Sequence, residues 1–84
     1  MRIRNWHASP AARRHMLEKH NVEWHEVDEV LATTHELQRA RTVRGEKRYH
    51  VRGRTDAGRR LTVIVTVEGD CLWAVTAYDS GRRL

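Results

Sequence analysis

The sequence has a single cysteine, Cys71, among its 84 residues, so no disulfide can form within the chain. A disulfide framework is thereby excluded, and a reducing compartment fits best. No apolar run approaches the roughly 20 residues of a membrane span, and the N-terminal stretch 1–6 lacks the apolar segment of a signal peptide. We therefore expect a cytoplasmic protein with no membrane partner.

The sequence also lacks the motifs of several enzyme classes. It has no glycine-rich phosphate loop and no dinucleotide-binding fingerprint. Its histidines show neither the H-E-x-x-H arrangement nor the paired Cys and His spacing of zinc sites; they are His7, His15, His20, His25, His35 and His50. We expect Cys71 in a buried strand, which argues against a nucleophilic thiol. The sequence therefore predicts neither a metal site nor a cofactor.

Positive charge is in excess. Sixteen Lys and Arg against eleven Asp and Glu give a net charge of +5, which favours an anionic partner, nucleic acid before an acidic protein. Nine of the sixteen lie in one stretch: Arg39, Arg41, Arg44, Lys47, Arg48, Arg52, Arg54, Arg59 and Arg60. Between Glu23 and Glu36 the balance reverses, with acidic residues and no Lys or Arg. The contact surface is therefore expected on the element that carries the basic stretch.

That stretch overlaps the most informative segment, residues 48–67, which alternates as two antiparallel strands joined by a turn at 55–58. Asp56 and Gly58 are typical turn residues. The expected apolar face comprises Tyr49, Val51, Leu61, Val63, Val65 and Val67. The opposite face comprises Arg48, His50, Arg52, Arg54, Arg60, Thr62, Ile64 and Thr66. Aligned cations cannot be buried unpaired, so this face meets either solvent or an anion, and its charge pattern suggests phosphate binding.

Two helices are expected before this hairpin. Ser9 and Pro10 are a good helix start, and the first helix is predicted to reach about His20, with Asn21 as a left-handed C-cap. The second is predicted from about Val22 to Ala32. Its apolar face contains Trp24, Val27, Val30 and Leu31, and we interpret Trp24 as a core anchor packed on the sheet. Its acidic face serves either solubility or a basic partner.

Further strands complete the expected fold. A short edge strand is expected within Arg2–Trp6, an exposed strand within 33–43, and turns at 44–46 and 68–70. Residues 71–78 are apolar on both faces, which predicts a central strand, and a short basic tail follows. The fold class is therefore α+β, a single domain over residues 1–84 with two N-terminal helices packed on a mostly antiparallel twisted sheet.

Several short motifs follow one another along the chain. They are K-H-N-V at residues 19–22, Glu26-Val27, Val30-Leu31, G-E-K-R at residues 45–48, and G-R-T at 53–55 with G-R-R-L at 58–61. In this order they resemble the K-H-G-V…E…V opening, the G-E-x-R and the G-R-(S/T)…G-R-x-L hairpin of BrnT-type toxins of type II toxin–antitoxin systems. The resemblance spans about residues 15 to 78. It implies a RelE-like fold, ribonuclease activity on RNA, and a small DNA-binding antitoxin through which the toxin can oligomerise.

Metal-independent cleavage by a 2′-OH requires proton-transfer groups and cations that stabilise the transition state. The candidate catalytic residues are His50, Glu46, Arg48, Arg54 and Arg60. The candidate RNA-binding residues are Arg52, Arg59, Lys47 and His20. Each has a plainer interpretation: His50 as an exposed strand residue, Glu46 and Arg48 as a turn ion pair, and His20 as a helix cap or packing residue.

Two functions therefore stay open. The first is a toxin-type endoribonuclease that an antitoxin neutralises. The second is a catalytically inactive module of the same fold that binds nucleic acid or protein. The order of the motifs favours the ribonuclease. The ending Thr76-Ala77-Tyr78, where the family has S-A-R, and the expected absence of the family's C-terminal helix favour the binding module.

Overall fold

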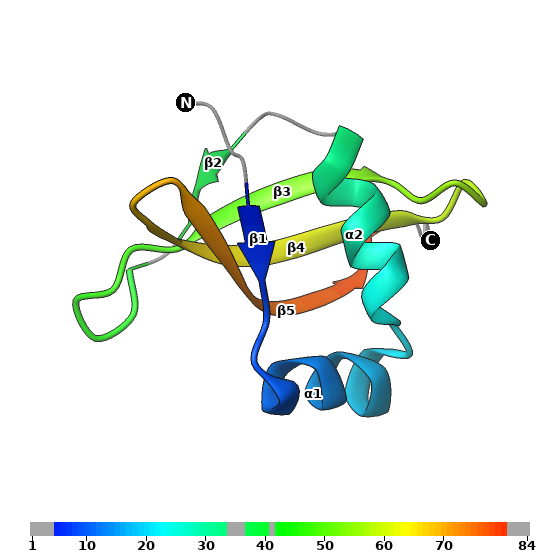
Figure 1. Ribbon diagram of the computed structural model, residues 1–84, viewed down its shortest axis with the longest axis horizontal. Helices are drawn as coiled ribbons and strands as arrows, with labels where there is room; N and C mark the ends of the chain where they lie inside the picture. Colours follow the sequence, from blue (N-terminus) through cyan, green and yellow to red (C-terminus); the bar gives the residue numbers. More distant parts are fainter. Residues whose placement is uncertain (1–4, 34–36, 41, 81–84) are drawn as a thin grey trace.

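The computed structural model describes residues 5–33, 37–40 and 42–80. In chain order the elements are β1 (Asn5–His7), α1 (Pro10–His20), α2 (Trp24–Thr33), β2 (Gln38–Arg39), β3 (Tyr49–Arg54), β4 (Arg60–Glu68) and β5 (Cys71–Asp79). Within the described residues the strands form one sheet of order β1-β5-β4-β3-β2, in which β1 is parallel to β5 and the other neighbours are antiparallel (Figure 1). The predicted α+β class, element order and mostly antiparallel sheet are confirmed. None of the described helices has the length and apolarity that crossing a membrane requires.

The predicted bounds and caps of α1 are confirmed. The Ser9 side chain accepts a hydrogen bond from the backbone N–H of Ala12 at 3.0 Å, and Pro10 occupies the first helical position. Asn21 ends the helix in the left-handed conformation, with φ 54° and ψ 41°. Its backbone N–H donates to the carbonyl oxygen of Leu17 at 3.0 Å. Asparagine therefore caps this helix in the left-handed conformation, which it tolerates better than most residues other than glycine.

The second helix, α2, begins two residues later than predicted. The backbone N–H of Glu23 donates to Oε1 of Glu26 at 3.1 Å, which is one half of a capping box and places the cap at Glu23. Val22 therefore precedes the helix, and it is completely buried together with Val27. Two apolar residues at these positions form the hydrophobic staple that fixes how a chain enters a helix.

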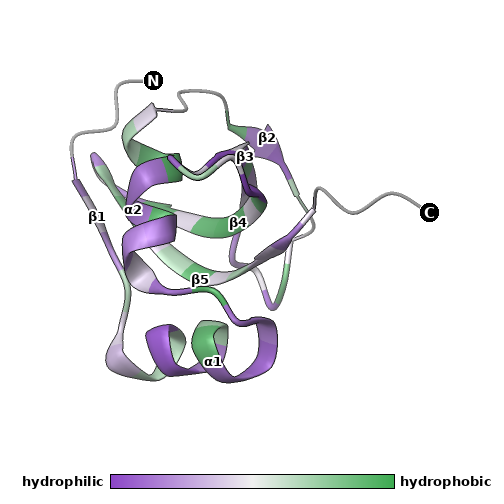
Figure 2. Cartoon of the chain, turned by 90° about the vertical axis from the view of Figure 1, so that its right-hand side faces the viewer, coloured by the Kyte–Doolittle hydropathy of each residue, from purple (hydrophilic) through white to green (hydrophobic). Residues whose placement is uncertain are grey.

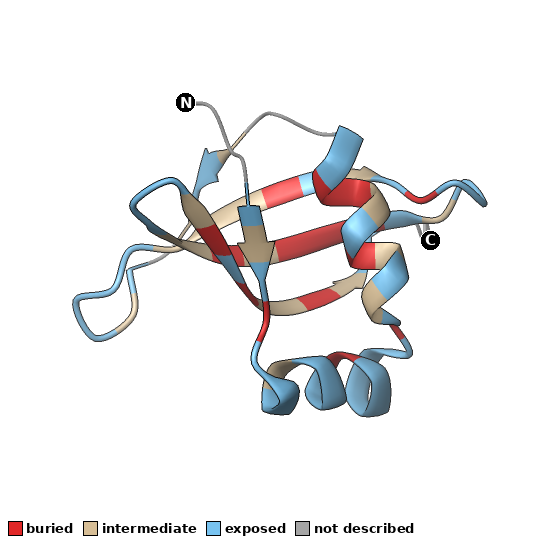
Figure 3. Ribbon diagram, viewed as in Figure 1, coloured by how far each residue is buried: buried red, intermediate tan, exposed pale blue. Residues whose placement is uncertain are grey.

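The core lies between α2 and the inner face of the sheet (Figure 3). It comprises Ala8, Met16, Val22, Val27, Val30, Leu31, Val51, Leu61, Val63, Val65, Leu72, Ala74 and Ala77. The predicted apolar faces of the hairpin and of α2 are thus confirmed, with Val67 and Tyr49 half-buried at the margin. Trp24 is also marginal: it is half-buried, and the guanidinium carbon of Arg13 lies 4.4 Å from the centre of its ring. It packs against the core without being its central anchor.

The turns follow the sequence expectations. Thr55 begins the β3–β4 turn, and its hydroxyl accepts from the backbone N–H of Arg59 at 3.1 Å, while Gly58 has φ 89°. Arg44 and Gly45 both have positive φ, 50° and 79°, which is the pattern of a type I′ turn. β2 lies within the stretch 33–43 predicted to be an exposed strand, whereas β1 overlaps the predicted edge strand at residues 5 and 6 and extends one residue further. Residues 2–4, 34–36 and 41 of those stretches, and the tail 81–84, lie outside the described residues.

The prediction for β5 is only partly correct. β5 is an inner strand between β1 and β4, but β4 is the central one, and Trp73 on β5 is 38% exposed. A register shift opposite Ile64 and Val65 leaves Val75 without a partner in β4. This β-bulge changes the alternation of the strand, so that residues 73 and 78 lie on the same face despite their odd spacing.

The acidic residues of α2 are tied to other elements of the fold. Asp28 accepts a hydrogen bond from Nε1 of Trp6 in β1 at 2.7 Å. Glu29 accepts from the backbone N–H of Asp56 in the hairpin turn at 2.9 Å, and Glu26 pairs with Arg59 at 3.0 Å. These carboxylates therefore fix the packing of α2, a role that neither sequence interpretation of the acidic face included.

Candidate nucleic-acid interface

Three arginines of the hairpin, Arg52, Arg54 and Arg60, lie on the sheet face that points away from α2. Arg52 is paired in register with Thr62, and Thr62 with Tyr78. Residues directly opposite on neighbouring strands share a face, so these three side chains form one row across the sheet. Arg54 and Arg60 form the next row. In Figure 2, α2 covers one side of the sheet and α1 lies beneath it, so no described helix covers the basic face.

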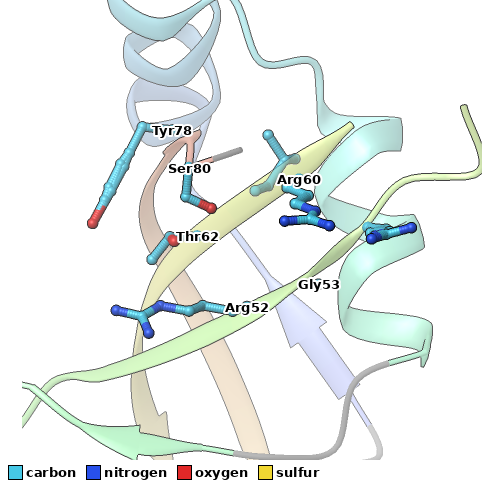
Figure 4. A pocket seen from close by; sticks show the side chains of 8 residues that line it. Arg52, Gly53, Arg60, Thr62, Tyr78 and Ser80 are labelled. Atoms are coloured by element: carbon cyan, nitrogen blue, oxygen red, sulfur yellow. The ribbon is translucent and has the colours of Figure 1, made fainter. Parts of the chain in front are cut away.

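These two rows surround a hollow of about 490 Å³. Its lining residues are Arg52, Gly53, Arg54, Arg60, Leu61, Thr62, Tyr78 and Ser80. Figure 4 shows Tyr78 and Arg52 extending to the same side of the sheet, with Thr62 between them. Three guanidinium groups line the hollow and, among the residues that the structure describes, no carboxylate does; we call it the arginine pocket.

The side chains that line the arginine pocket carry positive charge and would attract an anion. Arg54 and Arg60 stand directly opposite each other on neighbouring strands, and like charges in such a position destabilise a sheet. A phosphate group between them would reverse that effect, because each planar guanidinium presents a fork of donors to its oxygens. The Tyr78 hydroxyl adds a group that both donates and accepts hydrogen bonds. The pocket can therefore bind a phosphodiester and place a hydroxyl beside it.

The structure divides the predicted catalytic residues into two groups. Arg54 and Arg60 line the arginine pocket, whereas His50, Glu46 and Arg48 do not. Extended chain rises about 3.3 Å per residue, so the backbones of Arg48 and Arg54 lie about 20 Å apart along the strand. His50 shares the basic face but is paired with Ile64, one row before Arg52.

The Glu46–Arg48 pair has the geometry of the plainer interpretation. Nη2 of Arg48 lies 3.4 Å from Oε1 of Glu46, and the Glu46 side chain is 56% exposed. An exposed pair of this kind contributes about 1 kcal/mol at most. Lys47 lies between them and is exposed. These three residues lie at the Arg44–Gly45 end of the hairpin, away from the arginine pocket.

Arg59 is held within the fold. Its Nε donates to Oδ2 of Asp79 at 2.9 Å, and its Nη1 donates to both carboxylate oxygens of Glu26 at 3.0 and 3.1 Å. Nη1 also lies 2.8 Å from the carbonyl oxygen of Asn21. The hydrogen bond to Asp79 raises the pKa of Arg59 most strongly, and Glu26 raises it further against the opposing effect of burial. The structure therefore does not bring this predicted RNA-binding residue to the basic face.

His20 does not line the pocket, but it contacts the lining residue Tyr78. The two rings meet edge to face with centroids 6.2 Å apart, and the His15 ring also meets His20 edge to face, with centroids 5.4 Å apart. Sequence reasoning treated Tyr78 only as a departure from the family pattern, and it did not single out Thr62 or Ser80. The tyrosine was missed because the bulge at Val75 alters which residues of β5 share the arginine face.

Two other chemistries have little support in the described residues. No group of three or more His, Cys, Asp or Glu side chains in that part of the chain is placed to hold a metal ion. Partial burial raises the pKa of the Cys71 thiol, and the neighbouring Asp70 carboxylate raises it further. A raised pKa lowers the fraction of nucleophilic thiolate at neutral pH.

Comparison with protein-family models gives no match for the sequence, and comparison with curated proteins gives none either. Comparison of structures does give a match, to the crystal structure of the Brucella abortus ribonuclease toxin BrnT, determined at 1.1 Å. The TM-score is 0.61, and the alignment covers 98% of this chain and 99% of the other. This chain has the BrnT fold. The sequences are only 16% identical, so what the two proteins share is the fold, as the resemblance of the motifs predicted.

Proposed function

We propose that this protein is the toxin of a type II toxin–antitoxin system, an endoribonuclease that cleaves RNA and is neutralised by a cognate antitoxin. One observation carries the proposal: a pocket lined by three arginines, and by no carboxylate of the described part of the chain, lies on an open sheet face of a BrnT fold. The antitoxin, assembly through it, and a cytoplasmic location belong to the same proposal. Their support is the likeness in fold to a ribonuclease toxin, together with the single cysteine.

In the proposed reaction, the arginine pocket holds the scissile phosphate. The 2′-oxygen attacks phosphorus and loses its proton, while the bond to the 5′-oxygen breaks and that oxygen gains a proton. The products are a 2′,3′-cyclic phosphate and a 5′-hydroxyl. Arg52, Arg54 and Arg60 stabilise the additional negative charge of the transition state. Tyr78 is the proton-transfer group within the pocket, and His50, one row away on β3, is the second candidate.

A catalytically inactive module that binds nucleic acid or protein is the second candidate function. The observation in its favour is that Tyr78 lines the pocket at the position where the resembling family has arginine. A further one is that Glu46 and Arg48, two of the predicted catalytic residues, pair with each other at a distance from the pocket. This module would use the same three arginines to bind phosphate groups without breaking a bond.

The test is incubation of the purified protein with a mixed RNA substrate in the presence of EDTA. Cleavage by the wild type is expected, and Arg54→Ala is expected to lower its rate about 100- to 1,000-fold, as loss of a transition-state donor does. The matched control is Arg14→Ala, which removes an exposed arginine from α1. Equal cleavage by Arg54→Ala and wild type would refute the assigned site. Salt-sensitive binding without products would establish the binding module instead.

A further inference from the structure

Among the described residues, two large apolar side chains are exposed, and one of them lies on the basic face. They are Leu17 on α1, which is 49% exposed, and Trp73 on β5, which is 38% exposed. Trp73 is paired in register with Thr66, and Tyr78 with Thr62. Thr62 and Thr66 lie four residues apart in β4 and therefore face the same way. The indole thus shares its sheet face with the arginine pocket.

The neighbouring strand fixes the position of this indole. His7 of β1 is the register partner of Trp73, and the centroids of the two rings lie 5.0 Å apart with an angle of 38° between their planes. An aromatic contact of this kind restricts the rotation of a side chain that is otherwise free on an open face. The result is an ordered ring at the β1 side of the sheet with part of its surface open to solvent.

We propose that Trp73 is a base-stacking subsite for single-stranded RNA whose phosphate is held in the arginine pocket. The inference rests on the proposed function and adds to it a contact with a nucleobase. Four residues of β4 separate the two rows, which corresponds to about 13 Å, a distance that a few nucleotides span. Every base has a π-face, so an exposed aromatic residue beside a basic groove binds single strands with little dependence on sequence.

The charge of the face identifies the occupant. The three arginines that line the pocket on this face attract a polyanion, and they would repel a basic protein segment. An apolar protein partner would need a continuous apolar patch, whereas Trp73 stands among Thr66, His7 and half-buried Thr76. An isolated aromatic ring about 13 Å along the same face from a cluster of three arginines matches the spacing of bases and phosphates in RNA. Single-stranded RNA is therefore the partner that this face fits.

The test measures the affinity of a fluorescent 2′-O-methyl oligoribonucleotide, which cannot be cleaved, by fluorescence anisotropy. Trp73→Ala is expected to weaken binding about 5- to 150-fold, the range that corresponds to stacking on one base. Trp73→Phe is expected to restore most of that affinity because it keeps a ring. Trp73→Thr provides a second truncation with a residue suited to a strand. The matched control is Leu17→Ala, which removes the other exposed apolar side chain and is expected to bind like the wild type.

A scan with abasic nucleotides then separates stacking from a change in structure. One abasic position is expected to weaken binding to the wild type and leave binding to Trp73→Ala or Trp73→Thr unchanged. Equal losses in both proteins at every position would overturn the subsite. If Trp73→Ala and Trp73→Thr bind like the wild type while Arg54→Ala binds weakly, the subsite is wrong and the arginine pocket stands. If the wild type does not bind the oligonucleotide, the subsite and the proposed function both fail.

Discussion

Arg59 and Arg60 are adjacent in the sequence but have opposite roles in the structure, and this contrast yields the sharpest test of the fold. The Arg59 side chain is 24% exposed and the Glu26 side chain 16%, so their hydrogen bonds are shielded from water. Hydrogen bonds to charged groups contribute about 1.5–3 kcal/mol each, and partial exposure reduces that value. Arg59→Met keeps the apolar stem but leaves Glu26 without its cation. We expect the free energy of unfolding to fall by about 2–3 kcal/mol.

The assay is urea unfolding followed by far-UV circular dichroism, together with a thermal scan. For a domain of this size each kcal/mol corresponds to about 4–8 °C, so the expected decrease in Tm is about 8–24 °C. Arg60→Met is the matched control, because Arg60 is exposed and lies on the arginine face. We expect it to change stability by no more than about 0.5 kcal/mol and to lower RNA cleavage strongly.

Two results would refute this reasoning. If Arg59→Met unfolds within about 0.5 kcal/mol of the wild type, the network around Arg59 does not stabilise the fold. If Arg60→Met loses as much stability as Arg59→Met, then Arg60 also stabilises the fold, and its assignment to the open sheet face is wrong. A double-mutant cycle with Glu26→Gln isolates the pair, and additive losses would show that the two residues do not interact.

Two further predictions concern the ends of elements. Ser9→Ala removes the hydroxyl that accepts a hydrogen bond from the backbone N–H of Ala12. We expect the free energy of unfolding, measured in urea, to fall by about 1 kcal/mol. A fall of less than about 0.3 kcal/mol would show that Ser9 does not cap the helix. The raised pKa of Cys71 predicts that folded protein reacts with iodoacetamide more slowly than unfolded protein at pH 8. Because the unfolded thiol loses its proton at a lower pH than the folded one, the free energy of unfolding is expected to fall as the pH rises through the ordinary thiol pKa. Faster alkylation of the folded protein than of the unfolded protein would contradict the raised pKa.

Much of the site can be predicted from the sequence, because strand alternation is a local property. A period of two places Arg52, Arg54 and Arg60 on one face of the hairpin, and all three line the pocket. The same rule places Arg48 and His50 on that face too, but alternation says nothing about distance along the strand. Because the strand is extended, Arg48 lies too far along it to line the pocket. The predicted site therefore includes more of the strand than the pocket that the structure forms.

Other parts of the site depend on pairing between distant segments. Arg59 continues a run of charge in the sequence, yet Glu26 and Asp79, 33 and 20 residues away, hold it on the other side of the hairpin. Tyr78 and Trp73 are an odd number of residues apart, which in a regular strand places them on opposite faces. The register with β4 and the bulge at Val75 place them together. Neither relation is encoded in a local pattern.

The sequence by itself determined the helices, the hairpin, the turns and the basic face, because caps, turn residues and apolar periodicity act over a few neighbouring residues. The tertiary structure alone decided which cations are neutralised within the fold and which remain available to an anion. It also decided that an open pocket, a tyrosine and an exposed tryptophan share one surface. The physical reason is that ion pairs and strand register join residues far apart in the chain, whose partners a local pattern does not specify.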